Sequence, residues 1–156
     1  MGIRYRIDPD VGMTFVRWSG LVTASDFLAH TARLYADAGW PPQKHLHLTD
    51  LRDARFDRSI TEPLLVKMAE VYKRHPSIER FKVAMVASNF FGQAMIFQRA
   101  LKPSASVVVF SEFATACAWL GVTRHYADLR LRSLTPHPAR LATDAEISPD
   151  KARWRR

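Results

Sequence analysis

FKVAMVASNFFGQAMIFQRAL, residues 81–101, is the segment that predicts the fold class of this chain. Residues 83–87 are apolar at every position, which is typical of a strand buried on both faces in the middle of a parallel sheet. A helix is predicted to follow, with Asn89 as its N-cap. Its core-facing residues recur at helical spacing: Phe90, Ala94, Phe97 and Leu101. A doubly buried strand that leads directly into a helix indicates an α/β fold.

The chain before this segment begins with a predicted hairpin. Apolar and charged side chains alternate over residues 3–8, and a turn containing Pro9 and Gly12 leads to a second strand over residues 13–20. We therefore expect these two strands to pair in antiparallel fashion.

Two helices and a strand are predicted between the hairpin and residue 81. The first helix spans about residues 24–38, with Thr23 or Ser25 as its N-cap, Gly39 as its C-cap and His30 on its polar side. A strand over residues 45–51 follows. The second helix begins after Thr61, and Pro63 fits its first turn.

The chain after residue 101 predicts one more strand and one more helix. The strand covers residues 106–110, and the helix is capped by Ser111 and ended by Gly121. The predicted order is β-β-α-β-α-β-α-β-α, a mixed, mostly parallel five-stranded sheet with crossover helices. Residues 1–122 form this domain, and residues 123–156, which lack a sustained period, are predicted to be a basic tail that is partly ordered or packed on a partner.

The composition is that of an ordinary globular domain, with 47% hydrophobic and 24% charged residues in 156. No apolar run approaches the roughly 18 residues of a membrane span. The first residues have no secretory core, so we expect a cytoplasmic protein. The lone cysteine, Cys117, is expected to be a small buried hydrophobe rather than a nucleophile.

The net charge is +8, and half of it comes from residues 124–156, which hold eight basic and four acidic side chains. A basic end can bind phosphates, but it is more often a solvated terminus. Because no nucleic-acid-binding motif accompanies the charge, we do not expect nucleic acid as a partner.

Several segments together resemble the SpoIIAA-like proteins, small bacterial domains related to the STAS fold of anti-sigma-factor antagonists. These segments are VRWSG before the first helix, LTDLRDA after the third strand, FG at the third helix and VFSEFATACAWLG near residue 120. The resemblance covers residues 3–122. It implies one α/β domain whose relatives mostly lack an assigned biochemical activity.

The sequence departs from those antagonists at their phosphorylated serine. Their Asp-Ser-Ser/Thr-Gly motif opens the second helix, whereas this chain has FDRSITEP at residues 56–63. Ser59 is the candidate phosphorylation site that the resemblance implies. A phosphate there would gain from the helix dipole and free amides.

Polar residues at the carboxyl ends of the predicted strands are the candidate ligand-binding site. They are Trp18, Asp50, Arg52, Asp53, Ser88, Asn89, Gly92 and Gln93. One interpretation is a small polar or anionic ligand held by Arg52 and the helix N-terminus at Asn89. The other is that Arg52 pairs with its acidic neighbours and orders the loop. Gly92 is expected to allow close packing of the helix against a strand.

The third helix is apolar nearly all round, because Phe91, Met95 and Ile96 lie outside its core-facing line. Such a helix is either deeply buried or covered by a partner. The three residues are therefore candidates for core positions, for a homodimer interface or for a cleft that holds an apolar ligand.

His45, His47 and Thr49 are predicted to share one face of the third strand. Two histidines at this spacing could ligate a metal, but no third ligand is evident, so we expect neither a metal nor another cofactor. The histidines are instead expected where the sheet face is partly covered. No catalytic constellation can be recognised from the sequence.

These observations favour a non-enzymatic binding or regulatory module that forms a homodimer and acts through a protein or small-ligand partner. The alternative is a carrier of an apolar or lipid-like molecule, which the third helix would suit. A small enzyme that uses Asp50, Arg52 and Asp53 is a third hypothesis.

Overall fold

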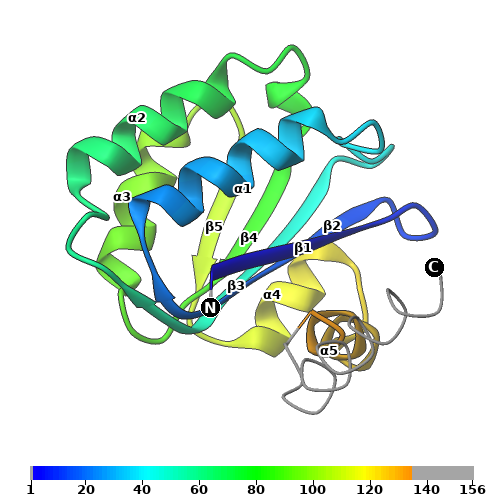
Figure 1. Cartoon of the computed structure of the whole chain (residues 1–156). Coiled ribbons are helices and arrows are strands. Elements are labelled where there is room, and N and C mark those ends of the chain that lie inside the picture. The colour runs from blue at the N-terminus through cyan, green and yellow to red at the C-terminus, as the bar shows by residue number, and fades with distance from the viewer. Residues whose placement is uncertain (1, 135–156) are drawn as a thin grey trace, which may run out of the picture.

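A five-stranded sheet forms the centre of the computed structural model, which describes residues 2–134 (Figure 1). The strands lie side by side in their order along the chain. They are β1 (Gly2–Asp8), β2 (Met13–Val22), β3 (Leu46–Phe56), β4 (Lys82–Val86) and β5 (Ser106–Phe110). β1 and β2 are antiparallel and all other pairs are parallel, which confirms the predicted hairpin and the mostly parallel sheet.

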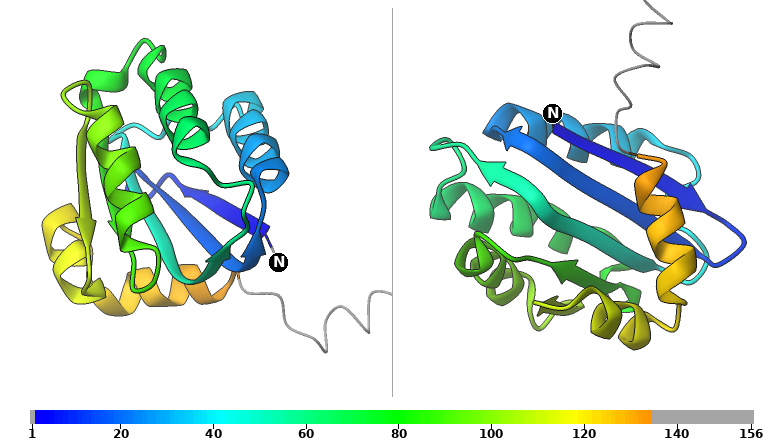
Figure 2. Two further views of the ribbon diagram at one scale, coloured as in Figure 1. Left: turned by 90° about the vertical axis from the view of Figure 1, so that its left-hand side faces the viewer. Right: turned by 90° about the horizontal axis from the view of Figure 1, so that it is seen from below.

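The helices cover both faces of the sheet. They are α1 (Ala24–Ala36), α2 (Glu62–Lys73), α3 (Phe91–Leu101), α4 (Phe113–Leu120) and α5 (Arg124–Arg132), with a short 3-10 helix, η1 (Ile78–Arg80), before β4. Figures 1 and 2 show α1, α2 and α3 on one face and α4 and α5 on the other. The three crossovers β2-α1-β3, β3-α2-β4 and β4-α3-β5 all step in the same direction across the sheet. Because crossovers between parallel strands share one handedness, their three helices lie on the same face.

Each face of the sheet has its own hydrophobic core. The core under α1, α2 and α3 contains Trp18, Phe27 and Leu65, among others. The core under α4 and α5 contains Phe15, Leu48 and Phe113. Cys117 belongs to the second core and is 1% exposed, as expected for a small buried hydrophobe.

The predicted N-caps of α1 and α2 are confirmed. The Thr23 hydroxyl accepts a hydrogen bond from the Asp26 amide, and the Asp26 carboxylate accepts one from the Thr23 amide, which forms a capping box. Thr61 accepts from the Leu64 amide. Each cap satisfies an amide that has no partner within its helix.

Gly121 is the C-cap of α4, as predicted, whereas three other predicted helix ends are wrong by one or two residues. The N-cap of α3 is Phe90, with a φ of 58°, instead of Asn89. The N-cap of α4 is Glu112 instead of Ser111, and α1 ends at the C-cap Asp37 instead of Gly39. The starts of α3 and α4 cannot be predicted from capping side chains, because neither Phe90 nor Glu112 makes a capping hydrogen bond.

Two more local predictions are corrected. His45 precedes β3 and has a φ of 55°, so it does not share a strand face with His47 and Thr49. Gly92 is exposed, and a β-carbon there would meet no atom within 4 Å. Gly92 therefore does not serve close packing of α3 against a strand.

Helix α5 lies beyond the predicted domain boundary at residue 122 and packs on α4 and β2. Thr123 caps it by accepting from the Tyr126 amide. On its inner side the Tyr126 hydroxyl donates to the Asp8 carboxylate, which also pairs with Arg130 Nε at 3.1 Å. Asp8 is 3% exposed, so α5 supplies the partners that a buried carboxylate needs. Residues 135–156 of the predicted tail lie outside the described residues.

We expect Tyr126→Phe to reduce the free energy of unfolding by about 1–3 kcal/mol, because it leaves a buried carboxylate without one donor. The matched control is Asp128→Ala, which breaks the exposed pair of Asp128 with Arg132 and should change stability by less than about 1 kcal/mol. Urea denaturation of both variants measures the difference. Equal effects would contradict an anchoring role for Asp8.

Candidate functional site

A cavity of about 90 Å³ lies in the core between the sheet and the layer of α1, α2 and α3. Seven of its lining residues are aromatic: Trp18, Phe27, Trp40, Phe56, Tyr72, Phe81 and Phe97. None of its lining residues, all within the described range, is an aspartate, glutamate, lysine or arginine. Protein interiors hold few voids larger than a water molecule, so a cavity of this size in the main core is the leading candidate for a binding site.

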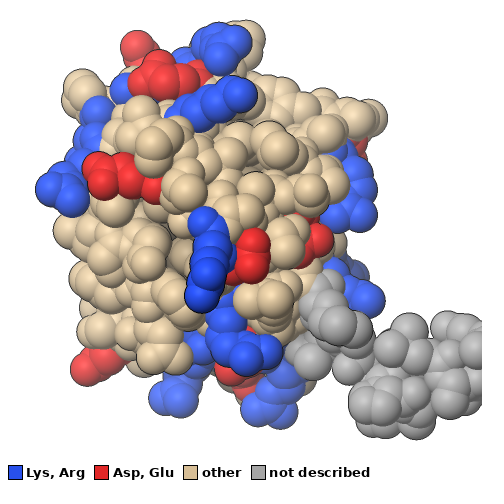
Figure 3. All heavy atoms as spheres, turned by 60° about the vertical axis from the view of Figure 1, so that its left-hand side comes forward, with Lys and Arg blue, Asp and Glu red and all other residues tan. Residues whose placement is uncertain are grey.

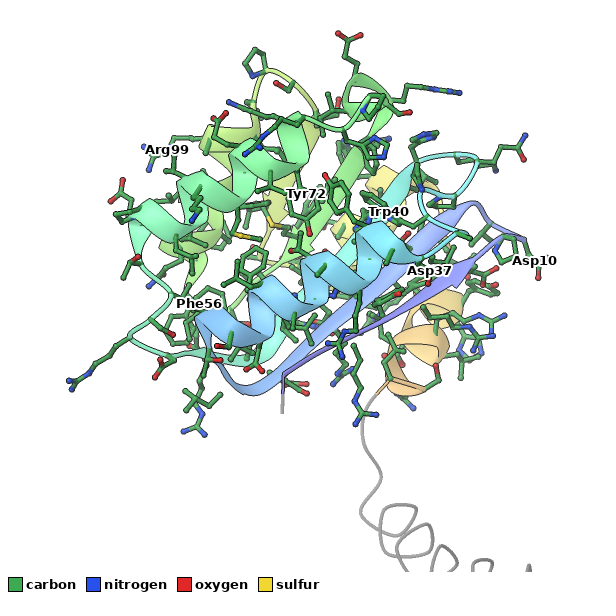
Figure 4. All side chains as sticks on the ribbon, turned by 45° about the horizontal axis from the view of Figure 1, so that its top comes forward. Asp10, Asp37, Trp40, Phe56, Tyr72 and Arg99 are labelled. Atoms are coloured by element: carbon green, nitrogen blue, oxygen red, sulfur yellow. The ribbon has the colours of Figure 1, made fainter. Side chains whose placement is uncertain are left out.

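Side chains that point to one face of the sheet form the floor of the cavity. Val16 on β2, Thr49 on β3 and Met85 on β4 are neighbours across the sheet and all line the cavity. The aromatic rings come from the surrounding elements. Figure 4 shows Tyr72 between α1 and α2, with Phe56 towards one end of these helices and Trp40 towards the other.

The aromatic rings hold one another in place. Trp18 meets Phe27 edge-on with ring centroids 5.0 Å apart, and Phe27 in turn lies 6.1 Å from Phe97. The Phe56 ring stacks on Phe90 at 4.8 Å. Edge-on and stacked pairs at these distances are favourable. The wall is therefore built by contacts among α1, β2, β3 and α3.

His47 is a buried histidine whose protonation state the structure determines. The Trp40 indole Nε1–H donates to His47 Nε2 at 3.0 Å. Because an indole nitrogen can only donate, Nε2 must accept, and the proton of the neutral ring is on Nδ1. Burial lowers the pKa of His47 to about 3, with a smaller contribution from nearby His30. The ring is thus neutral at physiological pH.

His30 lines the cavity from α1, and it was wrongly predicted to face water. It is 3% exposed, and burial followed by the charge of Arg33 lowers its pKa to about 4. Its Nδ1 atom has no hydrogen-bond partner among the described residues, and neither does Nε1 of the cavity-lining Trp18. The core around the cavity therefore holds neutral polar groups that the described protein does not satisfy.

The predicted acidic and basic cluster lies on the other face of the sheet. Asp50 is 1% exposed and accepts from Arg52 Nε at 2.9 Å and Nη2 at 3.0 Å. The guanidinium of Arg52 also lies 4.4 Å from the Phe113 ring centroid. Arg17, which the sequence analysis did not include, contacts Asp50 at 3.8 Å and Asp53 at 2.5 Å. Arg52 thus pairs with its own neighbour, as the second interpretation of the sequence expected.

The remaining predicted ligand-binding residues are divided between the cavity and the surface. Trp18 and Gln93 line the cavity. Ser88, Asn89 and Gly92 are exposed at the start of α3. The cavity thus shares with the predicted strand-end site only those two residues. The parallel strands follow one another across the sheet in chain order, so the sheet of the described residues has no switch point in the strand order. The strand-end rule places a ligand crevice at such a switch point.

The predicted interface residues of α3 differ in exposure. Phe91 is 37% exposed, whereas Met95 and Ile96 are half-buried and pack against the core of the cavity face. Their role in a homodimer stays a prediction.

Ser59 is exposed in the loop between β3 and α2. Its hydroxyl accepts from the Ala24 amide at 2.9 Å and donates to Asp57 at 2.7 Å. It therefore links this loop to the first turn of α1. Phosphorylation at Ser59 stays a prediction.

The residues that sequence reasoning missed come from outside the strand ends. The cavity is lined by Trp40 from the loop after α1, by Tyr72 near the end of α2 and by Phe81 directly before β4. A signal was present in the aromatic content of the chain, because 11% of its residues are aromatic. Their convergence on one cavity depends on the tertiary arrangement.

Comparison with solved structures identifies the fold. A crystal structure from Shewanella loihica PV-4, described as an uncharacterized protein of the DUF3478 family with a SpoIIAA-like fold, is similar to this chain with a TM-score of 0.52. The similarity covers 76% of this chain and 94% of that one, at 20% sequence identity. This chain has the SpoIIAA-like fold. The sequence matches no protein-family profile, and no curated protein matches it.

The SpoIIAA-like domain offers few other candidate sites. Within residues 2–134, no group of three histidine, cysteine, aspartate or glutamate side chains is arranged to hold a metal ion. No helix in the same part of the chain is long and apolar enough to cross a membrane. Figure 3 shows basic and acidic side chains distributed around one face with uncharged areas between them, so the charge on that face forms no single patch.

We expect stability to fall as the pH falls from 7 to 5. The pKa values of His30 and His47 are about 4 and about 3 in the fold, below the ordinary 6.5, so the unfolded chain binds more protons in this range. Each histidine contributes at most about 1.4 kcal/mol per pH unit to the loss. Their contribution to stability is complete above about pH 7 and is lost as the pH approaches the folded-state values.

Unfolding free energies of the wild type and of His30→Leu, measured between pH 7 and 5, test this expectation. The variant should show a shallower pH dependence, whereas replacement of the exposed His125 by glutamine serves as the control. An unchanged slope in His30→Leu would show that His30 does not titrate as a buried neutral group.

Proposed function

We propose that this protein is a non-enzymatic binding module for a small, mainly apolar molecule, which occupies the cavity between the sheet and α1, α2 and α3. The observation that carries the proposal is the cavity itself, because its surface is almost entirely apolar and it lies in the main core. A buried water needs two to four polar partners, so water is favourable only beside the few polar side chains of the wall. An apolar ligand gains by leaving water and by filling the void.

The size of the cavity limits the size of the ligand. An engineered dry cavity of about 150 Å³ in another protein binds benzene. The cavity here, at about 90 Å³, is of the same order, so it suits a molecule of about one ring. A long-chain lipid would require displacement of half-buried wall residues such as Phe56 and Phe97. The proposal therefore keeps the predicted small apolar ligand and gives less weight to a lipid-sized one.

Native mass spectrometry of gently purified protein, followed by organic extraction, tests the proposal directly. We expect either a bound extractable mass below that of a lipid or an empty protein that takes up small aromatic compounds such as indole. Failure of a panel of one-ring compounds to bind or to raise the melting temperature would overturn the proposal. The same spectrum reports the subunit number, which tests the separate prediction of a homodimer.

Filling the cavity should stabilise the empty protein and abolish binding. By the usual penalty for cavity volume, a void of about 90 Å³ costs about 2 kcal/mol, and part of this is recovered when Ala94→Leu extends into it from α3. We expect the variant to gain up to about 1 kcal/mol of stability and to lose indole binding, as measured by urea denaturation and calorimetry.

The matched control is Ala69→Leu on α2. Ala69 is fully buried in the same core but does not line the cavity, so the larger side chain should destabilise the fold by about 1–3 kcal/mol. Equal destabilisation by both substitutions would mean that the cavity has no space for a ligand.

A further inference from the structure

We propose that the ligand carries a neutral hydrogen-bond-accepting oxygen, such as a ketone or ester carbonyl, which binds to His47 Nδ1–H and the Thr49 hydroxyl on β3. This inference rests on the proposed function and specifies the chemical class of the ligand. It is carried by the polar groups of an otherwise apolar cavity and by the absence of charge in the cavity wall.

His47 presents a donor to the cavity. Its Nε2 atom is occupied by the hydrogen bond from Trp40, which fixes the proton on Nδ1. Among residues 2–134, no group accepts a hydrogen bond from Nδ1. Nδ1 does not belong to the fully inaccessible unpartnered atoms of the core, so it retains accessible surface at which an acceptor on a ligand can bind.

Thr49 lies two residues further along the same face of β3. Its register partners Val16 and Met85 are 1% and 5% exposed, whereas Thr49 is half-buried. Because helices cover this face of the sheet, the exposed part of Thr49 faces the cavity that it lines. No described group hydrogen-bonds to its hydroxyl, so it is available as a second donor.

The charge of the wall selects a neutral ligand group. The lining contains no ionisable carboxylate, lysine or arginine side chain, and both of its histidines are neutral near pH 7. A buried carboxylate or ammonium group of the ligand would have no counter-ion and would carry a large desolvation penalty. A carbonyl oxygen accepts from both donors without such a penalty.

The proposal is tested with two ligands of the same shape, acetophenone and α-methylstyrene, in which a C=O replaces a C=CH₂ group. Calorimetry with the full chain should show that acetophenone binds roughly 10- to 100-fold more tightly, the usual contribution of two hydrogen bonds. Benzoate, which is charged, should bind more weakly than acetophenone.

Thr49→Val keeps the shape of the side chain and removes its hydroxyl, so it should reduce the preference for acetophenone by roughly three- to tenfold, the contribution of one of the two hydrogen bonds. Thr14→Val is the matched control, because Thr14 is buried on the same face of neighbouring β2, has an unpartnered hydroxyl and does not line the cavity. This variant should keep the preference, and thermal unfolding confirms that both variants fold.

The outcomes separate this inference from the proposed function. Equal affinity of the wild type for the two ligands, an unchanged preference in Thr49→Val, or benzoate binding as tight as acetophenone would overturn the inference while the cavity remains a binding site. Binding of neither ligand, together with no effect of Ala94→Leu on small-molecule binding, would overturn the proposed function and the inference with it.

Discussion

The antiparallel pairing of β1 with β2 is the constraint on which the arrangement of the fold depends. β2 has β1 on one side and β3 on the other, and the later strands β4 and β5 add outward from β3. Each later crossover then steps in the same direction, and a uniform handedness places its helix on the same face. The cavity face therefore receives three helices, and α4 and α5 return on the opposite face to cover the second core (Figure 2).

The packing under the three helices explains why a cavity can persist there. The wall contains large rings that contact one another: Trp18 meets Phe27 edge-on, and Phe27 is tilted against Phe97. Rings held in this way cannot rotate to fill a neighbouring void without breaking several contacts at once.

The sequence was sufficient to predict the strands, their order along the chain and four of the five α-helices of residues 2–134, because hydrophobic periodicity and capping residues are local signals. It did not predict α5, since Ala127 and Leu131 are its buried residues and offer little apolar period. It placed His30 in water because histidine is polar, whereas the α1 face that meets the cavity includes it. The start of α3 at Phe90 depends on a left-handed backbone conformation that no side-chain capping signal indicates.

The two faces of the sheet treat buried polarity in different ways. On the α4 and α5 face, charged groups are buried and paired, as Asp50 is with Arg52 and Asp8 with Arg130. A ligand would have to break such pairs and leave a buried charge without its partner, although Arg17 Nε beside Asp50 has no hydrogen-bond partner among the described residues. On the cavity face, the unsatisfied groups are neutral, and a ligand can add hydrogen bonds there without breaking any. The polarity of the two cores thus favours binding in the cavity over binding at the predicted Asp50, Arg52 and Asp53 site.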